Sequence, residues 1–270
     1  TMPKPRLAIV AIGDSVTAGF HIDSDLKMFL RLWSDKKQSW FSTIVKRIEK
    51  LRPIVAKNYS TPSSKLVGKT LSDRLLNIKS MKAQVDEVLE ARHFPDMILV
   101  WTGHSALNWA TKPDQNFTRI SKGFQTDFQR QIRRLCAAAN KQKHKTGIIV
   151  FGFISIRTLF KLRALAEKQK KKTPLRFPYF EKSYRIFKSI RPEYRNRTIE
   201  LADLLNMVIS KTVASCQKKY KNDKFKIVYS PDLSKVGTNS LDYVTSLDAW
   251  HPSQRGQKKL AKAAWPVIKE

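Results

Sequence analysis

Short apolar runs separated by amphipathic stretches set the pattern of this chain. Five runs rich in β-branched and aromatic residues have the length and composition of strands buried on both faces. They are Leu7–Ile12, Ile54–Tyr59, Met97–Trp101, Ile148–Ile154 and Phe225–Tyr229. Between most of them, apolar residues recur every three or four positions, which is the spacing of an amphipathic helix. The alternation predicts a mostly parallel sheet covered by helices on both faces.

Three of the intervening stretches carry a continuous apolar stripe on one helical face. The first lies in Trp40–Leu51 and includes Trp40, Ile44 and Ile48. The other two stripes are Ile120, Phe124, Phe128, Ile132 and Leu135, and then Ala202, Leu205, Ile209, Val213 and Cys216. We interpret all three as faces that pack on the sheet, and we assign them no ligand.

Two polar turns follow predicted strands. Gly13-Asp14-Ser15 comes directly after the first apolar run, and Gly103-His104-Ser105 comes after the third. In sheets of this kind, ligands bind outside the carboxyl ends of the strands, so both turns are expected at the same rim. Gly-Asp-Ser is also common in ordinary loops. The turns therefore become informative only together with a partner elsewhere in the chain.

Such a partner lies far along the chain. Asp248 precedes His251 by three residues, and Ser253 has the character of a helix N-cap before the next amphipathic stretch. A serine hydroxyl becomes a nucleophile when a base takes its proton, and an imidazole titrates near neutrality. A carboxylate can fix the tautomer of that imidazole. Each piece is weak evidence alone, but Ser15, Asp248 and His251 together provide the groups of a serine hydrolase.

Length and charge limit the remaining possibilities. The 270 residues suffice for one large α/β domain or two small ones. The 52 basic and 22 acidic residues give a net charge of +30, which favours polyanions or anionic lipid surfaces as partners. Cys136 and Cys216 have no metal-ligand spacing and are expected to be buried free thiols. We find no signal peptide and no apolar run near the roughly 20 residues that span a bilayer. We therefore expect a soluble protein, with cytoplasm and secretion both open.

The segment Arg157–Arg191 interrupts the alternation of strands and helices. It holds 12 basic residues, opposed only by Glu167 and Glu181, with aromatic residues interleaved. We interpret it as an insertion after the fourth strand, on the same rim as Ser15. It is either a solvent-exposed helical segment or a lid that docks on an anionic lipid head group or polyanion. Lys218-Lys219-Tyr220-Lys221 is expected to be a helix end.

The two ends of the chain resemble a known family. Gly13-Asp14-Ser15-Val16 is similar to the first block of the GDSL, or SGNH, hydrolases, and Asp248-Ala249-Trp250-His251-Pro252 is similar to their last block, Asp-x-x-His-Pro. The resemblance implies a single domain, residues 1–270, with a flavodoxin-like three-layer α/β/α sandwich and an insertion at about 157–191. It implies ester hydrolysis without a metal or organic cofactor. Ser15 would be the nucleophile, His251 the base and Asp248 its orienter.

The two middle blocks depart from the family's pattern. The second block normally supplies a glycine N–H to the oxyanion hole, and Ser63 occupies that position, with Gly68 the next glycine. The third block is normally Gly-x-Asn, and here Ser105 replaces the asparagine. The resemblance therefore implies an oxyanion hole formed by Ser15, Ser63 and Ser105.

The replacement of that asparagine leaves three outcomes open. The Ser105 hydroxyl donates, His104 or Asn108 substitutes for it, or the enzyme is slow, because one lost oxyanion donor typically costs about 10²–10³ in kcat. We favour a substitute donor. His104 is as compatible with a supporting role as with direct contact to the substrate.

The substrate follows only from indirect features. The basic charge and the insertion favour a lysophospholipase, a phospholipase A-type enzyme or a general carboxylesterase that acts on small-molecule or lipid acyl esters, with peripheral contact to an anionic membrane surface. Trp101, Trp109 and Trp250 suit stacking on a sugar, so a glycan O-acetylesterase is the alternative. An alternative of another class is a catalytically degenerate basic module that binds anionic lipid or nucleic acid, with nucleic acid the less favoured partner.

Overall fold

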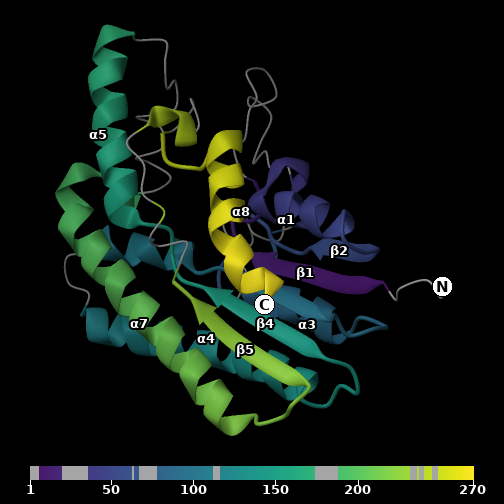
Figure 1. Cartoon of the computed structure of the whole chain (residues 1–270). Coiled ribbons are helices and arrows are strands. Elements are labelled where there is room, and N and C mark those ends of the chain that lie inside the picture. The colour runs from purple at the N-terminus through teal and green to yellow at the C-terminus, as the bar shows by residue number, and fades with distance from the viewer. Residues whose placement is uncertain are drawn as a thin grey trace.

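Figure 1 shows the computed structural model, which describes residues 6–19, 36–62, 64–66, 78–111, 116–173, 188–231, 236, 240–244 and 249–270. Its five strands are β1 (Leu7–Gly13), β2 (Ile54–Asn58), β3 (Met97–Trp101), β4 (Thr146–Phe151) and β5 (Phe225–Ser230). All four neighbouring pairs are parallel, in the order β2-β1-β3-β4-β5. This is the strand order of flavodoxin-like sheets. The predicted fold class is confirmed.

Helices cover both faces of this sheet. α1 (Trp40–Glu49) and α8 (Gln254–Lys269) pack together on one face, and α3 (Met81–Leu89) and α4 (Phe117–Ala139) lie on the other, as Figure 1 shows. α7 (Arg195–Lys219) packs against α4 and β5. Most side chains of the three predicted stripes are buried. Among the described helices, none is long and apolar enough to cross a bilayer.

The two cysteines and the basic tetrapeptide behave as the sequence predicts. Cys136 of α4 and Cys216 of α7 are buried free thiols. α7 ends at Lys219, so Lys218 and Lys219 form its last turn. Cations suit the negative end of a helix dipole.

The fourth strand ends earlier than its apolar run predicts. The run extends to Ile154, whereas β4 ends at Phe151. The N–H of Phe153 donates to Asn206 Oδ1 at 2.8 Å, and the N–H of Ile154 faces His104 Nε2 at 3.5 Å. These groups therefore bond to side chains instead of a neighbouring strand. The residues are apolar because they are buried beside the carboxyl edge of the sheet.

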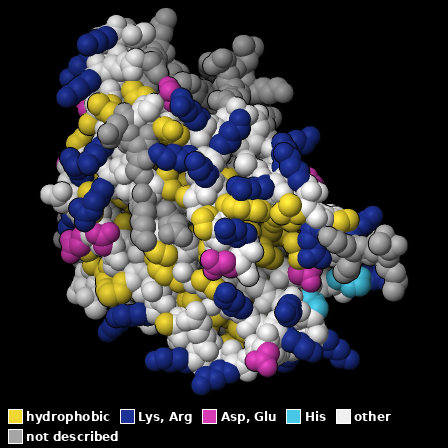
Figure 2. Space-filling view, in the orientation of Figure 1, with side chains coloured by type: hydrophobic (Ala, Val, Ile, Leu, Met, Phe, Trp, Pro, Cys, Tyr) yellow, Lys and Arg dark blue, Asp and Glu magenta, His cyan; other side chains and the backbone are white. Residues whose placement is uncertain are grey.

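The first half of the predicted insertion is a helix. α5 (Ile156–Lys172) begins at the N-cap Ser155, directly after β4, and stands out from the body beyond the carboxyl edge of the sheet (Figure 1). Apolar side chains such as Leu159 and Leu162 bury one face of α5, and basic side chains cover the exposed face. Figure 2 shows Lys and Arg side chains along its projecting end. Residues 174–187 lie outside the described part of the chain.

The remaining elements are short 3-10 helices. They are η2 (Lys36–Gln38), η3 (His104–Thr111), η4 (Lys188–Ile190), η5 (Pro192–Tyr194) and η7 (Leu241–Tyr243). Of these, η3 matters most for function, because it follows β3 at the carboxyl edge of the sheet.

Gly123 lies in the interior of α4, where glycine weakens a helix. Outside its own helix, a Cβ at this position would meet no atom of the described residues within 4 Å, so no close approach among them requires glycine. Alanine is more favourable than glycine in a helix interior by about 1 kcal/mol. We therefore expect Gly123→Ala to raise Tm by about 2–4 °C in thermal unfolding followed by circular dichroism. Gly256→Ala in α8 is the contrasting case, because a Cβ there would overlap the Tyr243 carbonyl oxygen and lower Tm. A lower Tm for Gly123→Ala would contradict the prediction.

Candidate active site

Ser15 lies in a tight turn directly after β1. The Ala18 N–H donates to the Asp14 carbonyl at 2.9 Å, and the Gly19 N–H donates to the Val16 carbonyl at 3.2 Å. The turn can begin here because Gly13 has no side chain, since a Cβ would overlap Thr17 and lie 2.8 Å from the Trp101 carbonyl oxygen. The turn places Ser15 at the carboxyl edge of the sheet.

His251 meets Ser15 from the other end of the chain. Its Nε2 lies 3.2 Å from Ser15 Oγ, across a separation of 236 residues. This distance suits proton transfer from the hydroxyl to the imidazole. His251 is only 2% exposed. Asp248, the predicted third member, lies outside the described residues.

The loop that carries His251 is fixed at several points. Val244 and Pro252 form an isolated bridge, and the Ser253 N–H donates to the Tyr243 carbonyl at 3.1 Å. The Ser253 hydroxyl accepts from the Gly256 N–H, so the predicted N-cap of α8 is confirmed. Ala249 has a φ of 52°, in the left-handed region that is unfavourable for alanine. Such strain persists only where the surrounding structure holds the backbone.

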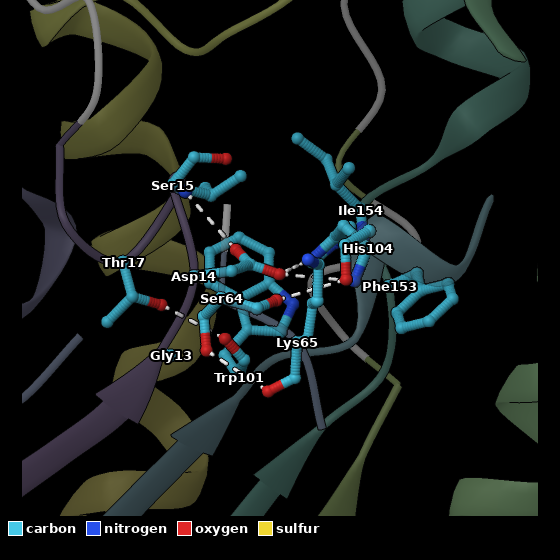
Figure 3. Close-up of polar contacts among 12 residues, drawn as sticks. Gly13, Asp14, Ser15, Thr17, Ser64, Lys65, Trp101, His104, Phe153 and Ile154 are labelled. Atoms are coloured by element: carbon cyan, nitrogen blue, oxygen red, sulfur yellow. Dashed lines mark hydrogen bonds and ion pairs between the residues drawn. The ribbon is translucent and has the colours of Figure 1, made fainter. Parts of the chain in front are cut away.

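A buried carboxylate fixes the serine turn to η3. Asp14 Oδ2 accepts from the backbone N–H of His104 at 3.1 Å and from its Nδ1 at 2.8 Å, as Figure 3 shows. Asp14 Oδ1 accepts from the Val16 N–H at 3.3 Å. Burial alone would raise the pKa of Asp14, but the charge interaction and the hydrogen bonds with His104, together with the Val16 N–H, hold it below its ordinary value. Asp14 is therefore ionised at neutral pH.

His104 is held on both ring nitrogens. Nδ1 lies 2.8 Å from Asp14 Oδ2, and Nε2 faces the N–H of Ile154 at 3.5 Å. The ring lies against Phe153, with centroids 4.7 Å apart, and edge-on to Trp101. In this arrangement, the His104 side chain supports the site and has no nitrogen left to donate to a substrate.

Two buried glutamines hold the backbone on either side of Ser15. Gln84 of α3 accepts from the Gly13 N–H at 2.8 Å and donates to the Gly13 carbonyl at 2.9 Å. Gln257 of α8 donates to the Val16 carbonyl at 3.1 Å and accepts from the Trp40 N–H at 2.8 Å. Both glutamines are 0% exposed.

Sequence reasoning missed both glutamines. Each interrupts an apolar helical face, Gln84 beside Val85 and Val88, and Gln257 beside Leu260 and Ala261. A polar residue inside an apolar stripe was the available signal, because a buried amide must find hydrogen-bond partners.

We expect Gln84→Met to slow ester hydrolysis by misplacing Ser15. Methionine has a similar length but cannot bond Gly13, and small displacements of a reacting group can cost roughly 10²-fold in rate. Steady-state kinetics should show kcat reduced by about 10–100-fold, with a smaller change in KM. Gln142→Met is the matched control, because among the described residues the Gln142 amide bonds only to the nearby Ala138 carbonyl. A variant with lowered Tm but unchanged kcat would show that Gln84 only stabilises the fold.

A cavity of about 760 Å³ opens over Ser15 and His251. Its apolar lining includes Leu66, Leu107, Trp109, Ile120, Phe124 and Trp250. Lys65, Arg119 and Asp127 add charge to the lining, and Arg119 forms no ion pair with any residue that the structure describes. The cavity therefore combines a large apolar surface with the cationic side chain of Arg119.

The tryptophans do not all reach this cavity. Trp101 is fully buried in β3, packs edge-on against Trp40 and donates to the Gly152 carbonyl at 2.8 Å. The expectation that Trp101 could stack on a sugar is therefore wrong, because its side chain points into the core. Trp109 is 43% exposed and lines the cavity together with Trp250.

The expected oxyanion donors differ in whether the structure describes them and in whether their N–H or O–H group already has an acceptor. The Ser15 N–H donates to no residue in the described ranges. Ser63 and Gly68 lie outside those ranges. The Ser105 hydroxyl donates to the Ser64 carbonyl at 3.0 Å, so its single proton is already engaged.

Asn108 keeps a side-chain donor. Its Oδ1 accepts from the Ser189 hydroxyl at 3.0 Å, which fixes the orientation of the amide. Its Nδ2 donates to no residue that is described, and Asn108 lines the cavity. The sequence suggests several substitutes for the family's asparagine. Among those that the structure describes, Asn108 has a side-chain N–H with no acceptor in the described residues.

Comparison with known proteins gives one family across nearly the whole chain. The family described as GDSL-like Lipase/Acylhydrolase matches residues 9–264. No curated protein matches the chain.

Several solved structures have a similar fold at low sequence identity. Est24, a carbohydrate acetylesterase from Sinorhizobium meliloti, is 12% identical with a TM-score of 0.59, over 98% of this chain and 99% of that one. A family two carbohydrate esterase from Clostridium thermocellum, in complex with cellohexaose, is 14% identical with a TM-score of 0.54, over 100% of this chain but only 66% of that one. The lipase Lip_vut3 from a goat rumen metagenome is 14% identical with a TM-score of 0.52, over 97% of each chain. At these identities, the likeness shows the fold alone.

Proposed function

Because the chain belongs to the GDSL-like lipase/acylhydrolase family and is an esterase or lipase by that membership, we propose that it cleaves acyl esters through an acyl-enzyme intermediate on Ser15. The observation that carries the proposal is the 3.2 Å approach of His251 Nε2 to Ser15 Oγ beside the cavity. We further propose that residues 1–270 act as one catalytic domain, with the segment 157–191 inserted in it.

The reaction proceeds in two halves. His251 Nε2 takes the hydroxyl proton as Ser15 Oγ attacks the ester carbonyl carbon, and it returns that proton to the departing alkoxide as the ester C–O bond breaks. Water then attacks the acyl-enzyme, again losing a proton to Nε2, and the acid leaves as Ser15 regains its hydroxyl proton. Asp248, three residues before His251, is the proposed acceptor for the other ring nitrogen.

The oxyanion in both halves needs donors that are already in place. We assign one to the Ser15 N–H and, from the family resemblance, one to the Ser63 N–H. For the side-chain donor, we propose Asn108 Nδ2 in place of Ser105, because the Ser105 proton is engaged by the Ser64 carbonyl.

A lipid acyl ester is the proposed substrate class. The cavity has a large apolar lining for an acyl group, and Arg119 offers a cation to an anionic part of the substrate. The exposed basic face of α5 projects from the rim that carries Ser15, which supports peripheral contact with an anionic membrane surface. A lysophospholipase or phospholipase A-type activity fits these features.

A glycan O-acetylesterase is the second candidate. Trp109 is the observation that favours it, because this residue is 43% exposed and lines the cavity together with Trp250. Exposed aromatic rings near a reacting serine suit stacking on a sugar.

Release of acid from two substrates tests these alternatives. We expect the wild type, but not Ser15→Ala, to release fatty acid from lysophosphatidylglycerol and little acetate from acetylated xylo-oligosaccharides. Acetate release alone would favour the second candidate. Failure on both would contradict the lipid and glycan proposals and favour a binding module. Duplex DNA binding that collapses between about 50 and 200 mM salt would then identify that module as a nucleic-acid binder.

A further inference from the structure

One wall of the cavity follows a single face of α4. Arg119, Ile120, Gly123, Phe124 and Asp127 line the cavity, and their spacing places them on adjacent turns of one helical face. The eight steps from the first to the last correspond to about 12 Å of helix. The wall is therefore long enough to contact far more than the atoms next to a scissile ester.

Phe124 contributes a tightly packed aromatic ring to this wall. Its ring stacks on Phe128 with centroids 5.4 Å apart and meets Phe153 edge-on at 6.4 Å. It also lies close to Gly103, where a Cβ would be 2.9 Å from the ring. The ring is thus fixed on several sides and cannot rotate away to change the shape of the cavity.

Gly123 opens the same wall beside this ring. It lies one turn after Arg119 and one turn before Asp127, and it separates the two charged side chains along the helix. Outside its own helix, no atom of the described residues comes within 4 Å of the position of a Cβ. Glycine weakens the helix here and meets no packing need, and its effect on the cavity is to leave open space between the two charged side chains.

Resting on the hydrolase function proposed above, we propose that the α4 wall binds the acyl chain of the substrate and that Gly123 determines which chain lengths fit. Short acyl groups occupy the part of the cavity next to Ser15. Longer chains run over Ile120 and Phe124 and cross α4 at Gly123, between Arg119 and Asp127. The CH₂ groups gain stability by leaving water for this apolar surface.

The test fills the gap with a side chain. p-Nitrophenyl acetate, butyrate, octanoate and palmitate are hydrolysed by the wild type, Gly123→Phe and the matched control Gln125→Phe, at an exposed position of α4 that does not line the cavity. Outside its own helix, a Cβ at this position meets no atom of the described residues within 4 Å, so the branch to the phenylalanine ring leaves α4 without a clash at that atom. We expect Gly123→Phe to lower kcat/KM for palmitate by at least about tenfold and to leave acetate within about twofold, since small changes in an apolar pocket are worth that much. Gln125→Phe should keep the wild-type profile.

A binding measurement separates this inference from the proposed function. A fluorescent long-chain fatty acid is titrated into Ser15→Ala and into Ser15→Ala/Gly123→Phe, and we expect at least about tenfold weaker binding to the double variant. Ser15-dependent hydrolysis with a chain-length profile unchanged by Gly123→Phe would overturn the inference and leave the hydrolase standing. A uniform loss on all four esters would also overturn it. If no ester is hydrolysed, the proposed function fails, and weaker binding to the double variant still supports the chain site, whereas equal binding overturns it.

Discussion

Ser15→Ala and His251→Ala should each reduce kcat for ester hydrolysis by roughly four to six orders of magnitude. Without Oγ there is no acyl-enzyme, and without Nε2 the hydroxyl keeps its proton and remains a poor nucleophile. The two groups act as one unit, so the double variant should be no slower than the worse single variant. Hydrolysis of p-nitrophenyl butyrate at neutral pH measures the loss.

Two controls test whether the loss of activity is specific to Ser15 and His251. His144→Ala removes a histidine whose exposed side chain lies 3.7 Å from Asp96, away from the cavity lining, and it should keep full activity. A fluorophosphonate probe should phosphonylate Ser15 Oγ with loss of fluoride in the wild type and leave Ser15→Ala unlabelled. Tm should change little in Ser15→Ala, because the side chain is only half-buried. Full activity in both variants would show that another residue is the nucleophile.

Asp14→Asn should destabilise the fold more than any other single acidic substitution described here. The Asp14 carboxylate accepts three hydrogen bonds from groups at the carboxyl edge of the sheet, and an amide presents donors to one of those positions. Removing one partner of a buried charged pair typically costs about 3–5 kcal/mol. Because Asp14 also links the Ser15 turn to η3, kcat should fall as well. Urea denaturation and steady-state kinetics measure the two effects.

The same variant should lose part of the pH dependence of stability. The pKa of Asp14 in the folded state lies below its unfolded value, so its contribution is fully present above the unfolded pKa and is lost as pH falls through the folded pKa. The unfolding free energy of the wild type should therefore drop between about pH 5 and pH 2, more steeply than that of Asp14→Asn. Asp242→Asn is the control, because its ion pair with Arg255 is largely exposed and worth less than about 1 kcal/mol. Parallel pH profiles for wild type and Asp14→Asn would contradict this account.

The sequence predicts the strands and helices of the three layers well, because the spacing of apolar residues shows which side of each element is buried. The β1 and β3 runs and the stripes on α1, α4 and α7 are local patterns that burial imposes residue by residue. Ser15 and His251 could be placed at one edge because each follows from a simple rule, a turn after a parallel strand and a loop before a capped helix. Their 3.2 Å approach is the product of those two local features.

The sequence does not predict the hydrogen bonds from side chains to backbone atoms that lie far away along the chain. Gln84 bonds Gly13 across 71 positions, and no pattern links the two. The engagement of Ser105 by the Ser64 carbonyl likewise depends on how two loops meet. Trp101 belongs to a buried strand, and only the packing of the sheet shows that its ring lies in the core instead of the cavity.

The distance along the chain between Ser15 and His251 also determines when activity arises during synthesis. At about 5–20 residues per second, a ribosome takes roughly 10–50 s to add the 236 residues that separate them. Throughout that interval the emerging polypeptide holds the proposed nucleophile without its base. Gln257 and the rest of α8, which complete the turn around Ser15, are made later still. On the proposed mechanism, we therefore expect a nascent chain to leave nearby esters intact until the residues around His251 have left the exit tunnel and docked.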